Sequence, residues 1–432
     1  MEARSFRSVR ERGAVGHFGL RVLSVVVVTL SRISRYRLLP SPAQEQALVE
    51  HCGHARYVWN LAVEQHLHWK PGRRSAPGFA AQSRQLTEAR AEFGWLRAGS
   101  IIVQQQALRD FWQAMANFFG GTHRRPTWRK RGRHEGFRIV AVKPNDVRRL
   151  SRNTGQVKVP KVGWVRFRWS RALPDQVKSY RVTRDAAGRW HVAFAAIPIP
   201  IPIPAQGSGE VVGVDRGVAV SAALSTGELL RVPRLRDTEA RRLLRLQRKL
   251  ARARHGSNRR AKVKRAIARL KAREADRRKD WVEKTTTMLA RRYDLIAVEN
   301  LKIPGMTRSG RGIRDALGRN VRQKAGLNRG ILTSGWGRLV ERLEHKAPDR
   351  IIKVNPAYTS QTCNTCGNLA AESRQSQAVF SCVACGHRAH ADVNAARNIR
   401  DTAAGRAVAA RGGPPLGEPV NREPQRDLLL ME

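Results

Sequence analysis

Four of the five cysteines occur as two closely spaced pairs, with two residues inside each pair and fifteen between the pairs. They are Cys363, Cys366, Cys382 and Cys385. Each Cys-x-x-Cys turn directs two thiolates at a common point, so the spacing predicts one tetrahedral Zn²⁺ in a zinc ribbon at residues 361–388. Because four cysteine ligands leave no open coordination position, we expect this ion to stabilise the fold and to support a grip on nucleic acid, not to catalyse.

Three carboxylates each border an apolar element. Asp215 and Glu299 end apolar runs typical of buried strands, and Asp392, seven residues after Cys385, begins a helix. Taken singly, Asp215 would also fit a turn after a strand, and Asp392 would fit an ordinary helix N-cap. A further apolar run at 350–354 also predicts a strand. The predicted order is then three consecutive strands, two separate strands and a helix. Because the three acids lie at the edges of elements in this order, one site shared by all three is favoured over the separate explanations.

Carboxylates gathered at one sheet edge repel one another unless divalent cations lie between them. Two Mg²⁺ or Mn²⁺ ions need few protein carboxylates, and together they can activate water and stabilise the leaving oxygen in phosphodiester hydrolysis. The sequence therefore predicts a catalytic magnesium site with two ions, held by Asp215, Glu299 and Asp392.

The charge of the chain indicates its partner. The 432 residues include 82 Lys and Arg against 34 Asp and Glu, a formal net charge of +48, and 41% hydrophobic residues, enough for the cores of two or three domains. Basic residues recur along the whole chain instead of flanking one amphipathic helix, so nucleic acid is favoured over a membrane surface. Residues 20–30 are too short to span a bilayer and predict a strand. Only Cys52 remains outside the ribbon, so no disulfide framework is expected and a reducing cytoplasm is the expected location.

A basic loop near the middle of the amino-terminal half combines cations with one aromatic ring. Its Arg and Lys residues can contact phosphates while its tryptophan stacks on a base, a combination that a merely solvated loop does not need. We therefore predict nucleic-acid contacts by Arg124, Arg125, Trp128, Arg129, Lys130 and Arg131.

Regular elements must position these groups. Apolar and polar side chains alternate in residues 31–39, which predicts a strand. A capping box at Ser41 then predicts the start of a helix. A second helix is predicted at about 101–119, followed by short strands at 156–169 and 179–195. This half of the chain is therefore predicted to form strands around a helical insert.

The middle of the chain contains a linker and a strongly basic segment. Alternate Ile and Pro residues followed by glycines predict a semi-rigid joint at 197–209. Residues 231–292 carry 24 Arg and Lys against six acids, with leucines at helical spacing and a break at 255–258. This pattern predicts a helical hairpin that contacts nucleic acid, since a solvated face alone would repel itself. Residues 306–328, rich in Gly and Arg, predict a mobile loop near the carboxylates.

Several motifs together resemble a known family. The strand ends Val214–Gly217 and Val298–Leu301, the segments Asn355–Gln361 and His390–Asn398, and the cysteine ribbon resemble the split RuvC-type nuclease of the TnpB (insertion-sequence OrfB) proteins, relatives of the type V CRISPR effectors. The segments Tyr36–Pro42, Arg56–Asn60, Gly335–Arg338 and Leu343–Ala347 resemble other parts of the same family. The resemblance covers residues 33 to 425, and the combined motifs are highly specific.

The resemblance implies an α/β architecture with two main parts. It implies an RNase H-like (RuvC-type) split nuclease domain with an inserted zinc ribbon, preceded by an amino-terminal β-barrel (wedge) domain with a helical (recognition) insert. We expect these segments: an extension at 1–30; the wedge and recognition domain at 31–196, with its insert at about 42–120; a linker at 197–209; the first part of the nuclease at 210–360, with a basic helical hairpin at 234–292; the ribbon at 361–388; the last part of the nuclease at 389–400; and a tail at 401–432.

The resemblance also implies an activity. TnpB proteins use a guide RNA derived from the transposon end to cleave matching double-stranded DNA beside a short motif, and the three nuclease acids map onto Asp215, Glu299 and Asp392. An Mg²⁺-dependent DNA endonuclease is therefore expected. Two alternatives stay open: a guided or non-specific DNA- and RNA-binding protein that regulates transposition, and a transposase that joins strands.

Overall fold

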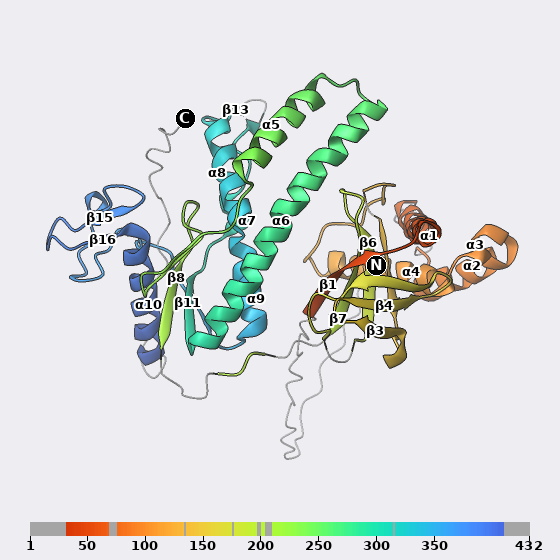
Figure 1. Ribbon diagram of the computed structural model, residues 1–432, viewed down its shortest axis with the longest axis horizontal. Coiled ribbons are helices and arrows are strands. Elements are labelled where there is room, and N and C mark those ends of the chain that lie inside the picture. The colour runs from red at the N-terminus through yellow and green to blue at the C-terminus, as the bar shows by residue number, and fades with distance from the viewer. Residues whose placement is uncertain are drawn as a thin grey trace, which may run out of the picture.

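The computed structural model describes residues 32–68, 76–133, 135–174, 177–196, 200–203, 210–313 and 316–409. Two large sheets organise these residues, a seven-stranded sheet before the linker and a five-stranded sheet after it (Figure 1). The predicted extension 1–30, with its strand at 20–30, most of the linker 197–209 and the end of the tail 401–432 lie outside the described residues. None of the described helices combines the length and hydropathy needed to cross a bilayer.

The first sheet is antiparallel and open. Its strands follow the order β2-β6-β7-β1-β5-β4-β3. β1 changes partner along its length, because it pairs with β7 as far as Arg37 and with β5 from Leu38 onward. No pairing in the described part of the chain joins β2 to β3, so the predicted barrel is not closed by hydrogen bonds. The strands are β1 (Arg32–Leu39), β2 (Gly136–Val140), β3 (Val147–Ser151), β4 (Thr154–Val159), β5 (Gly163–Arg168), β6 (Ser179–Arg184) and β7 (Trp190–Ala196).

Aromatic side chains fill the inside of this curled sheet. The ring of Tyr36 lies 5.5 Å from that of Phe167 and 5.6 Å from that of Phe194. The Tyr180 hydroxyl on β6 donates a hydrogen bond of 2.7 Å to the backbone oxygen of Lys158 on β4, across the sheet. Because large buried rings contribute much of the stability of a core, these contacts hold the curl of the sheet.

Among the described residues between β1 and β2 there are four helices: α1 (Pro42–Leu67), α2 (Phe79–Glu92), α3 (Gly94–Ala98) and α4 (Ile101–Phe119). The predicted capping box is present, since the Ser41 side chain accepts from the Gln44 N–H and the Gln44 side chain accepts from the Ser41 N–H. α4 has the predicted bounds. α2 and α3 were not predicted from the sequence.

The second sheet positions the predicted acids. Its order is β10-β9-β8-β11-β14, with β8 antiparallel to β9 and parallel to β11, and β11 parallel to β14. Because β8 and β11 run in the same direction, their carboxyl ends meet at one edge of the sheet. The strands are β8 (Val211–Asp215), β9 (Ala222–Leu224), β10 (Leu229–Leu230), β11 (Leu295–Glu299) and β14 (Ile351–Val354).

Helices cover both faces of the second sheet. On one face, Val212 and Val298 pack with Leu289 of α6 (Asn258–Arg292) and Leu343 of α9 (Trp336–Lys346). On the other face α10 (Ala391–Ala409) lies against β8 and β11. Its approach to Gly213 is so close that a Cβ there would stand 1.9 Å from the backbone oxygen of Ala396. Only glycine therefore fits under this helix.

The basic segment forms the predicted helical hairpin. α5 (Asp237–Arg252) and α6 pack together, and Ser257 caps α6 by accepting from the Arg260 N–H (Figure 1). The prediction of a mobile loop at 306–328 is wrong in part, because regular elements occupy some of this segment. The structure has α7 (Ile303–Met306), the short strands β12 (Gly312–Ile313) and β13 (Ala316–Leu317), and then α8 (Val321–Ser334).

Candidate active site and metal centre

Three carboxylates meet at the edge of the second sheet. Asp215 and Glu299 are the last residues of the neighbouring parallel strands β8 and β11, directly after the paired residues Val214 and Val298. Asp392 lies in the first turn of α10, which packs on β8. A Cβ at Gly217 would lie 3.6 Å from Oδ2 of Asp392, so the loop after β8 also adjoins this acid.

The electrostatics of this edge are unfavourable without a cation. Burial raises the pKa of Asp215 well above its ordinary value, and the negative charges of Glu299 and Asp392 raise it further. Asp215 keeps part of its surface open to solvent, whereas only 9% of Glu299 and 7% of Asp392 is exposed. Burial also raises the pKa of Asp392. Acids that interact so closely need positive charge between them when they ionise.

Two side chains that were not predicted hold these acids. The hydroxyl of Thr359 donates to Oε1 of Glu299 at 2.8 Å. The guanidinium of Arg374, from the segment between the two cysteine pairs, lies 3.3 Å from Oδ1 of Asp392 and offsets part of the rise in pKa that burial causes. In addition, Arg216 donates to the backbone oxygen of Glu299. Only Arg216 and Thr359 had a signal in the sequence, because they belong to the motifs around Asp215 and at 355–361.

The chemistry of this donor set fits divalent magnesium, because the ion prefers oxygen ligands and needs few protein carboxylates.

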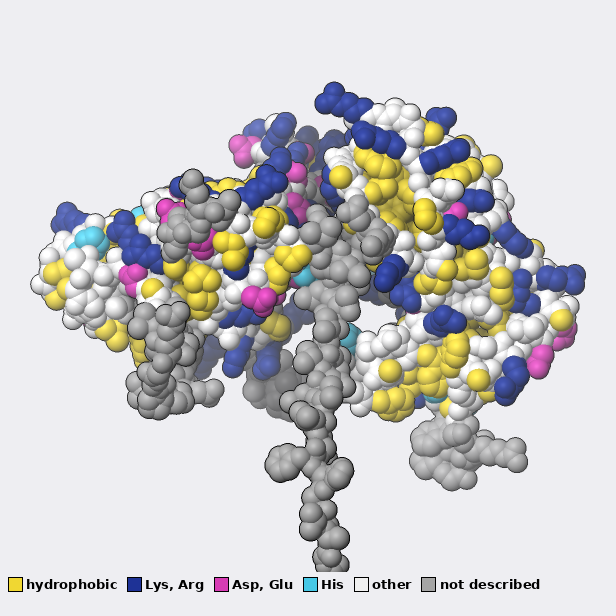
Figure 2. Space-filling view, turned by 90° about the horizontal axis from the view of Figure 1, so that it is seen from below, with side chains coloured by type: hydrophobic (Ala, Val, Ile, Leu, Met, Phe, Trp, Pro, Cys, Tyr) yellow, Lys and Arg dark blue, Asp and Glu magenta, His cyan; other side chains and the backbone are white. Residues whose placement is uncertain are grey.

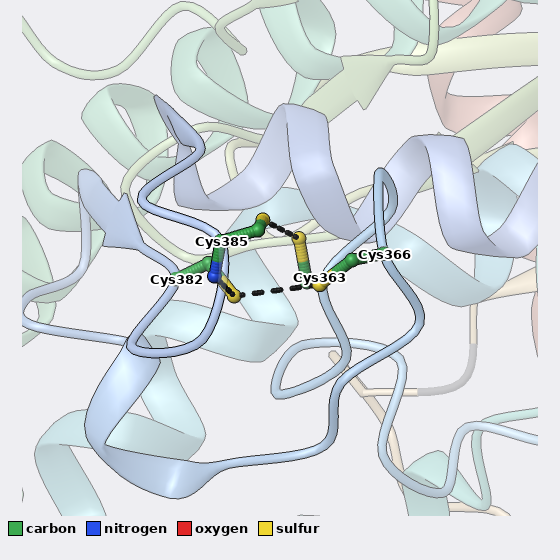
Figure 3. Close-up of side chains that lie close together, drawn as sticks. All are labelled: Cys363, Cys366, Cys382 and Cys385. Carbon is green, nitrogen blue, oxygen red and sulfur yellow. Dashed lines mark hydrogen bonds between the residues drawn. The ribbon is translucent and has the colours of Figure 1, made fainter.

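The four cysteines form a compact cluster (Figure 3). The sulfur of Cys363 lies 3.8 Å from that of Cys385, and the sulfur of Cys366 lies 3.6 Å from that of Cys382. Strands β15 (Val379–Ser381) and β16 (Arg388–His390) pair in the same small unit. Four thiols at these separations fit one tetrahedral Zn²⁺, as the spacing of the sequence predicts.

The pKa values of two thiols in this cluster are shifted in opposite directions. The backbone N–H of Cys385 lowers the pKa of Cys382 to about 6, which favours its thiolate. At Cys385 the backbone N–H of His387 acts in the same direction, but the neighbouring sulfurs outweigh it and raise the pKa to about 12. A bound metal ion would remove this conflict, because it favours the thiolate form of every ligand.

Asparagines on α10 join the cysteine unit to the sheet. Asn394 donates to the backbone oxygen of Thr362, and Asn398 donates to the backbone oxygens of Thr359 and Thr362, all at 2.7 or 2.8 Å. The backbone N–H of Asn364 in turn donates to the Asn394 side chain. The base of the ribbon is thus fixed to the helix that carries Asp392.

The basic loop is held against α1, away from the carboxylates. Asn60 bonds to both the N–H and the carbonyl of Arg129, and the Trp59 ring donates to the backbone oxygen of Thr127. The Arg129 guanidinium lies 3.7 Å from the centre of the Trp59 ring, and burial lowers its pKa to about 10. Arg129 is therefore half-buried on α1, whereas Arg124, Arg125, Trp128, Lys130 and Arg131 are exposed. Figure 2 shows Lys and Arg spread over the visible face and not gathered in one patch.

Known families match three parts of the chain. Residues 194–310 match the family described as "Probable transposase", and residues 336–399 match "Cas12f1-like, TNB domain". Residues 31–69 match a family described as "Helix-turn-helix domain", although the described part of this segment forms strand β1 and the single helix α1.

Relatives align with almost the whole chain. "Putative RNA-guided DNA endonuclease InsQ" of Escherichia coli (strain K12) is 36% identical over 397 residues, which cover 90% of this chain and 96% of that protein. "Putative RNA-guided DNA endonuclease" of Streptomyces pristinaespiralis is 30% identical, over 89% of this chain and 91% of its own. Among solved structures, the "Cryo-EM structure of the Cas12f1-sgRNA-target DNA complex" has a TM-score of 0.49 at 15% identity and covers 83% of this chain and 81% of that one.

Proposed function

Because the chain belongs to the TnpB (OrfB) family, we propose that it is an RNA-guided DNA endonuclease of an insertion sequence. In the proposed reaction, metal-dependent hydrolysis cleaves the target DNA next to a short DNA motif. The observation that carries the proposal is the clustering of Asp215, Glu299 and Asp392 at one sheet edge, in a chain that aligns over 90% of its length with a relative named as such an enzyme.

The part of the chain after the linker is proposed to be an RNase H-like (RuvC-type) nuclease, split into residues 210–360 and 389–400 by the ribbon at 361–388. The order of β8, β9, β10, β11, β14 and α10 supports this assignment, since it matches the order of three strands, two separate strands and a helix predicted from the sequence. Residues 31–196 would then form the wedge and recognition part, which we propose reads the short DNA motif.

The three acids would hold two Mg²⁺ ions, since their oxygens suit this ion and their mutual repulsion needs a cation. When bound, the ions supply the positive charge that activates a water molecule and stabilises the leaving oxygen. The protein orients the ligands, because Thr359 holds one oxygen of Glu299 and Arg374 faces one oxygen of Asp392. Arg374 also keeps the pKa of Asp392 below the value that burial alone would give, which favours the ionised ligand at neutral pH.

A guide RNA from the transposon end and double-stranded target DNA are the proposed partners. The formal charge of +48 supports them, as does the exposure of Arg241, Arg242, Arg245, Arg248 and Lys249 along α5. In enzymes of this type, base pairing reads most of the sequence, and the protein holds the RNA–DNA duplex by its backbone and shape. Positive charge spread over both parts of the chain fits contacts between the protein and the phosphate backbone of the nucleic acid.

A cleavage assay tests the proposal. The full chain, purified with its co-expressed RNA, is given matching DNA and Mg²⁺, and cut products are expected from the wild type but not from Asp215→Ala or Glu299→Ala. The matched control is Asp280→Ala, which removes an exposed acid from α6 and should leave cleavage unchanged. If both site variants cut as well as the wild type, the assignment of the acids is wrong.

The family description "Probable transposase" keeps strand joining as a second candidate. The same acids could serve it, because joining and hydrolysis differ only in the nucleophile that attacks the phosphate. Assaying for joined strands as well as free ends separates the two reactions. Tight, salt-sensitive binding with no product in Mg²⁺ or Mn²⁺ would instead indicate a binding protein without turnover.

A further inference from the structure

Two neighbouring grooves on the amino-terminal part share one tryptophan. The first, of about 600 Å³, lies on α1 and is lined by the rings of Tyr57, Trp95 and Trp128. The second, of about 580 Å³, is lined by Trp128 and by arginines from the basic loop and the first sheet. Both volumes fall within the roughly 300–1,000 Å³ typical of pockets that hold small molecules.

The first groove is chemically suited to a base. Tyr57, Trp95 and Trp128 are 44%, 50% and 41% exposed, so their rings are available to a ligand. The rings of Tyr57 and Trp95 meet edge to face at 4.9 Å, which supports one ring against the other. The carboxylates of Glu50 and Glu64 also line this groove. They repel phosphate, but they can accept hydrogen bonds from the amino group of a base or from a ribose hydroxyl.

The second groove is suited to phosphate. Arg35, Arg129, Arg133, Arg181 and Arg184 line it, together with the single carboxylate of Glu135. Glu135 is already paired with Arg56, which reaches both of its oxygens at 3.1 Å. The Nε atom of Arg35 is buried without a hydrogen-bond partner, so it has a hydrogen to offer to an anion. Arg181 and Arg184 are paired with Asp110 and Glu45, so the excess of positive charge in this groove comes from Arg35, Arg129 and Arg133.

The tryptophan between the grooves is held in position before any ligand arrives. Its neighbours Thr127 and Arg129 are fixed to α1 by the hydrogen bonds from Trp59 and Asn60. A loop that is already ordered does not have to be ordered on binding, which favours affinity.

We propose that these grooves form a binding site for one unstacked nucleotide of a single-stranded RNA, with its base against Trp128 in the first groove and its phosphate in the second. RNA is favoured over DNA because its 2′-hydroxyl can donate to the carboxylates beside the rings, and because RNA recognition commonly stacks unpaired bases on aromatic side chains. The site deepens the proposed function, on which it rests, by giving the guide RNA a point of contact outside the pairing region. It extends the loop contacts predicted from the sequence to a defined base pocket formed with α1 and α3.

Binding and stacking can be measured without cleavage. The full chain, freed of RNA at high salt, is titrated with a single-stranded RNA on the order of ten nucleotides long that contains 2-aminopurine, whose fluorescence falls on stacking. We expect quenching with the wild type, and at least about tenfold weaker binding with little quenching for Trp128→Ala. Trp128→Phe should restore most of both signals, since it keeps an aromatic face.

Phe119→Ala is the matched control, because it removes another exposed ring, on α4, and should change neither signal. Equal binding and quenching by wild type and Trp128→Ala would overturn the site. A DNA strand of the same sequence that binds as tightly, with the same dependence on Trp128, would overturn the assignment to RNA. A wild type that binds and quenches but never cleaves matching DNA would leave this site standing and refute the proposed nuclease.

Discussion

The cysteine cluster and the carboxylate cluster are both proposed to bind cations, but the chain assembles them differently. The four cysteines lie within one short segment, and two local turns bring their sulfurs together. The acids come from β8, β11 and α10 and are brought together only when the second sheet and its helix have formed. We therefore expect the order of the cysteine cluster to depend on its ion, and the order of the carboxylate cluster to depend on the fold around it.

Removing one ligand of the cysteine cluster should have the largest effect. Cys382→Ser is expected to reduce bound zinc from one per chain to almost none, and a structural zinc site contributes on the order of 10 kcal/mol of binding energy to folding. Metal analysis and thermal melting with and without a chelator measure the change. Cys52→Ala, which alters the buried cysteine outside the ribbon, should keep its zinc. A Cys382→Ser protein that keeps one zinc and a chelator-sensitive melting temperature would contradict the four-cysteine site.

In the carboxylate cluster, the support from the fold can be weakened without removing a ligand. Thr359→Val keeps the shape of the side chain but loses the hydrogen bond to Glu299, so cleavage should fall about tenfold, the usual cost of a bond to a charged group. Thr359→Ser retains the hydroxyl and should cleave nearly as fast as the wild type. Equal rates for the valine variant and the wild type would show that Glu299 needs no such support.

The two clusters are joined by Arg374, which lies between the cysteine pairs but faces Asp392. Because its charge lowers the pKa of Asp392, Arg374→Gln should leave more of this acid protonated at a given pH. Cleavage is expected to fall about threefold at neutral pH and to recover at higher pH. The control, Arg388→Gln, removes an exposed charge from the same ribbon. If both variants have the wild-type pH profile, the ribbon does not tune the carboxylates.

The smallest effect concerns stability without divalent ions. The pKa of Asp215 is higher in the folded than in the unfolded protein, so the folded state binds its proton more tightly and becomes less stable as pH rises through that pKa. Asp215→Asn should therefore melt a few degrees higher than the wild type at neutral pH, and the difference should vanish as the pH falls. Melting curves in a chelator at several pH values test this. Added Mg²⁺ should reverse the order, because only the wild type keeps its full ligand set.

Local patterns in the sequence predicted which acids and which cysteines lie close together, but contacts between distant segments did not appear in them. The strands that end in Asp215 and Glu299 were found because each is an apolar run closed by an acid. Arg374 was missed because only the folding of the ribbon brings it to Asp392. The position of the acids is thus predicted from sequence, while their roles remain proposals that the variants above test.

Two helices, α2 and α8, escaped prediction for separate reasons. In α2 only Gln82 and Leu86 are buried, so the segment has almost no apolar stripe for a pattern to detect. α8 contains Gly326 and Gly330, residues that disfavour helices and suggested a loop. Gly330 faces Val218, where a Cβ would come within 2.6 Å, so close packing and not local preference explains this glycine.

The contact between Gly213 and α10 has a consequence for how substitutions would be interpreted. Position 213 carries no side chain, yet a single methyl group there would push away the helix that carries Asp392. In a saturation-mutagenesis screen scored by DNA cleavage, this glycine should therefore be as intolerant as the acids themselves. A map of intolerant positions would therefore include residues that set the geometry of the centre as well as residues that take part in its chemistry. Measuring metal binding by each inactive variant would separate these two groups.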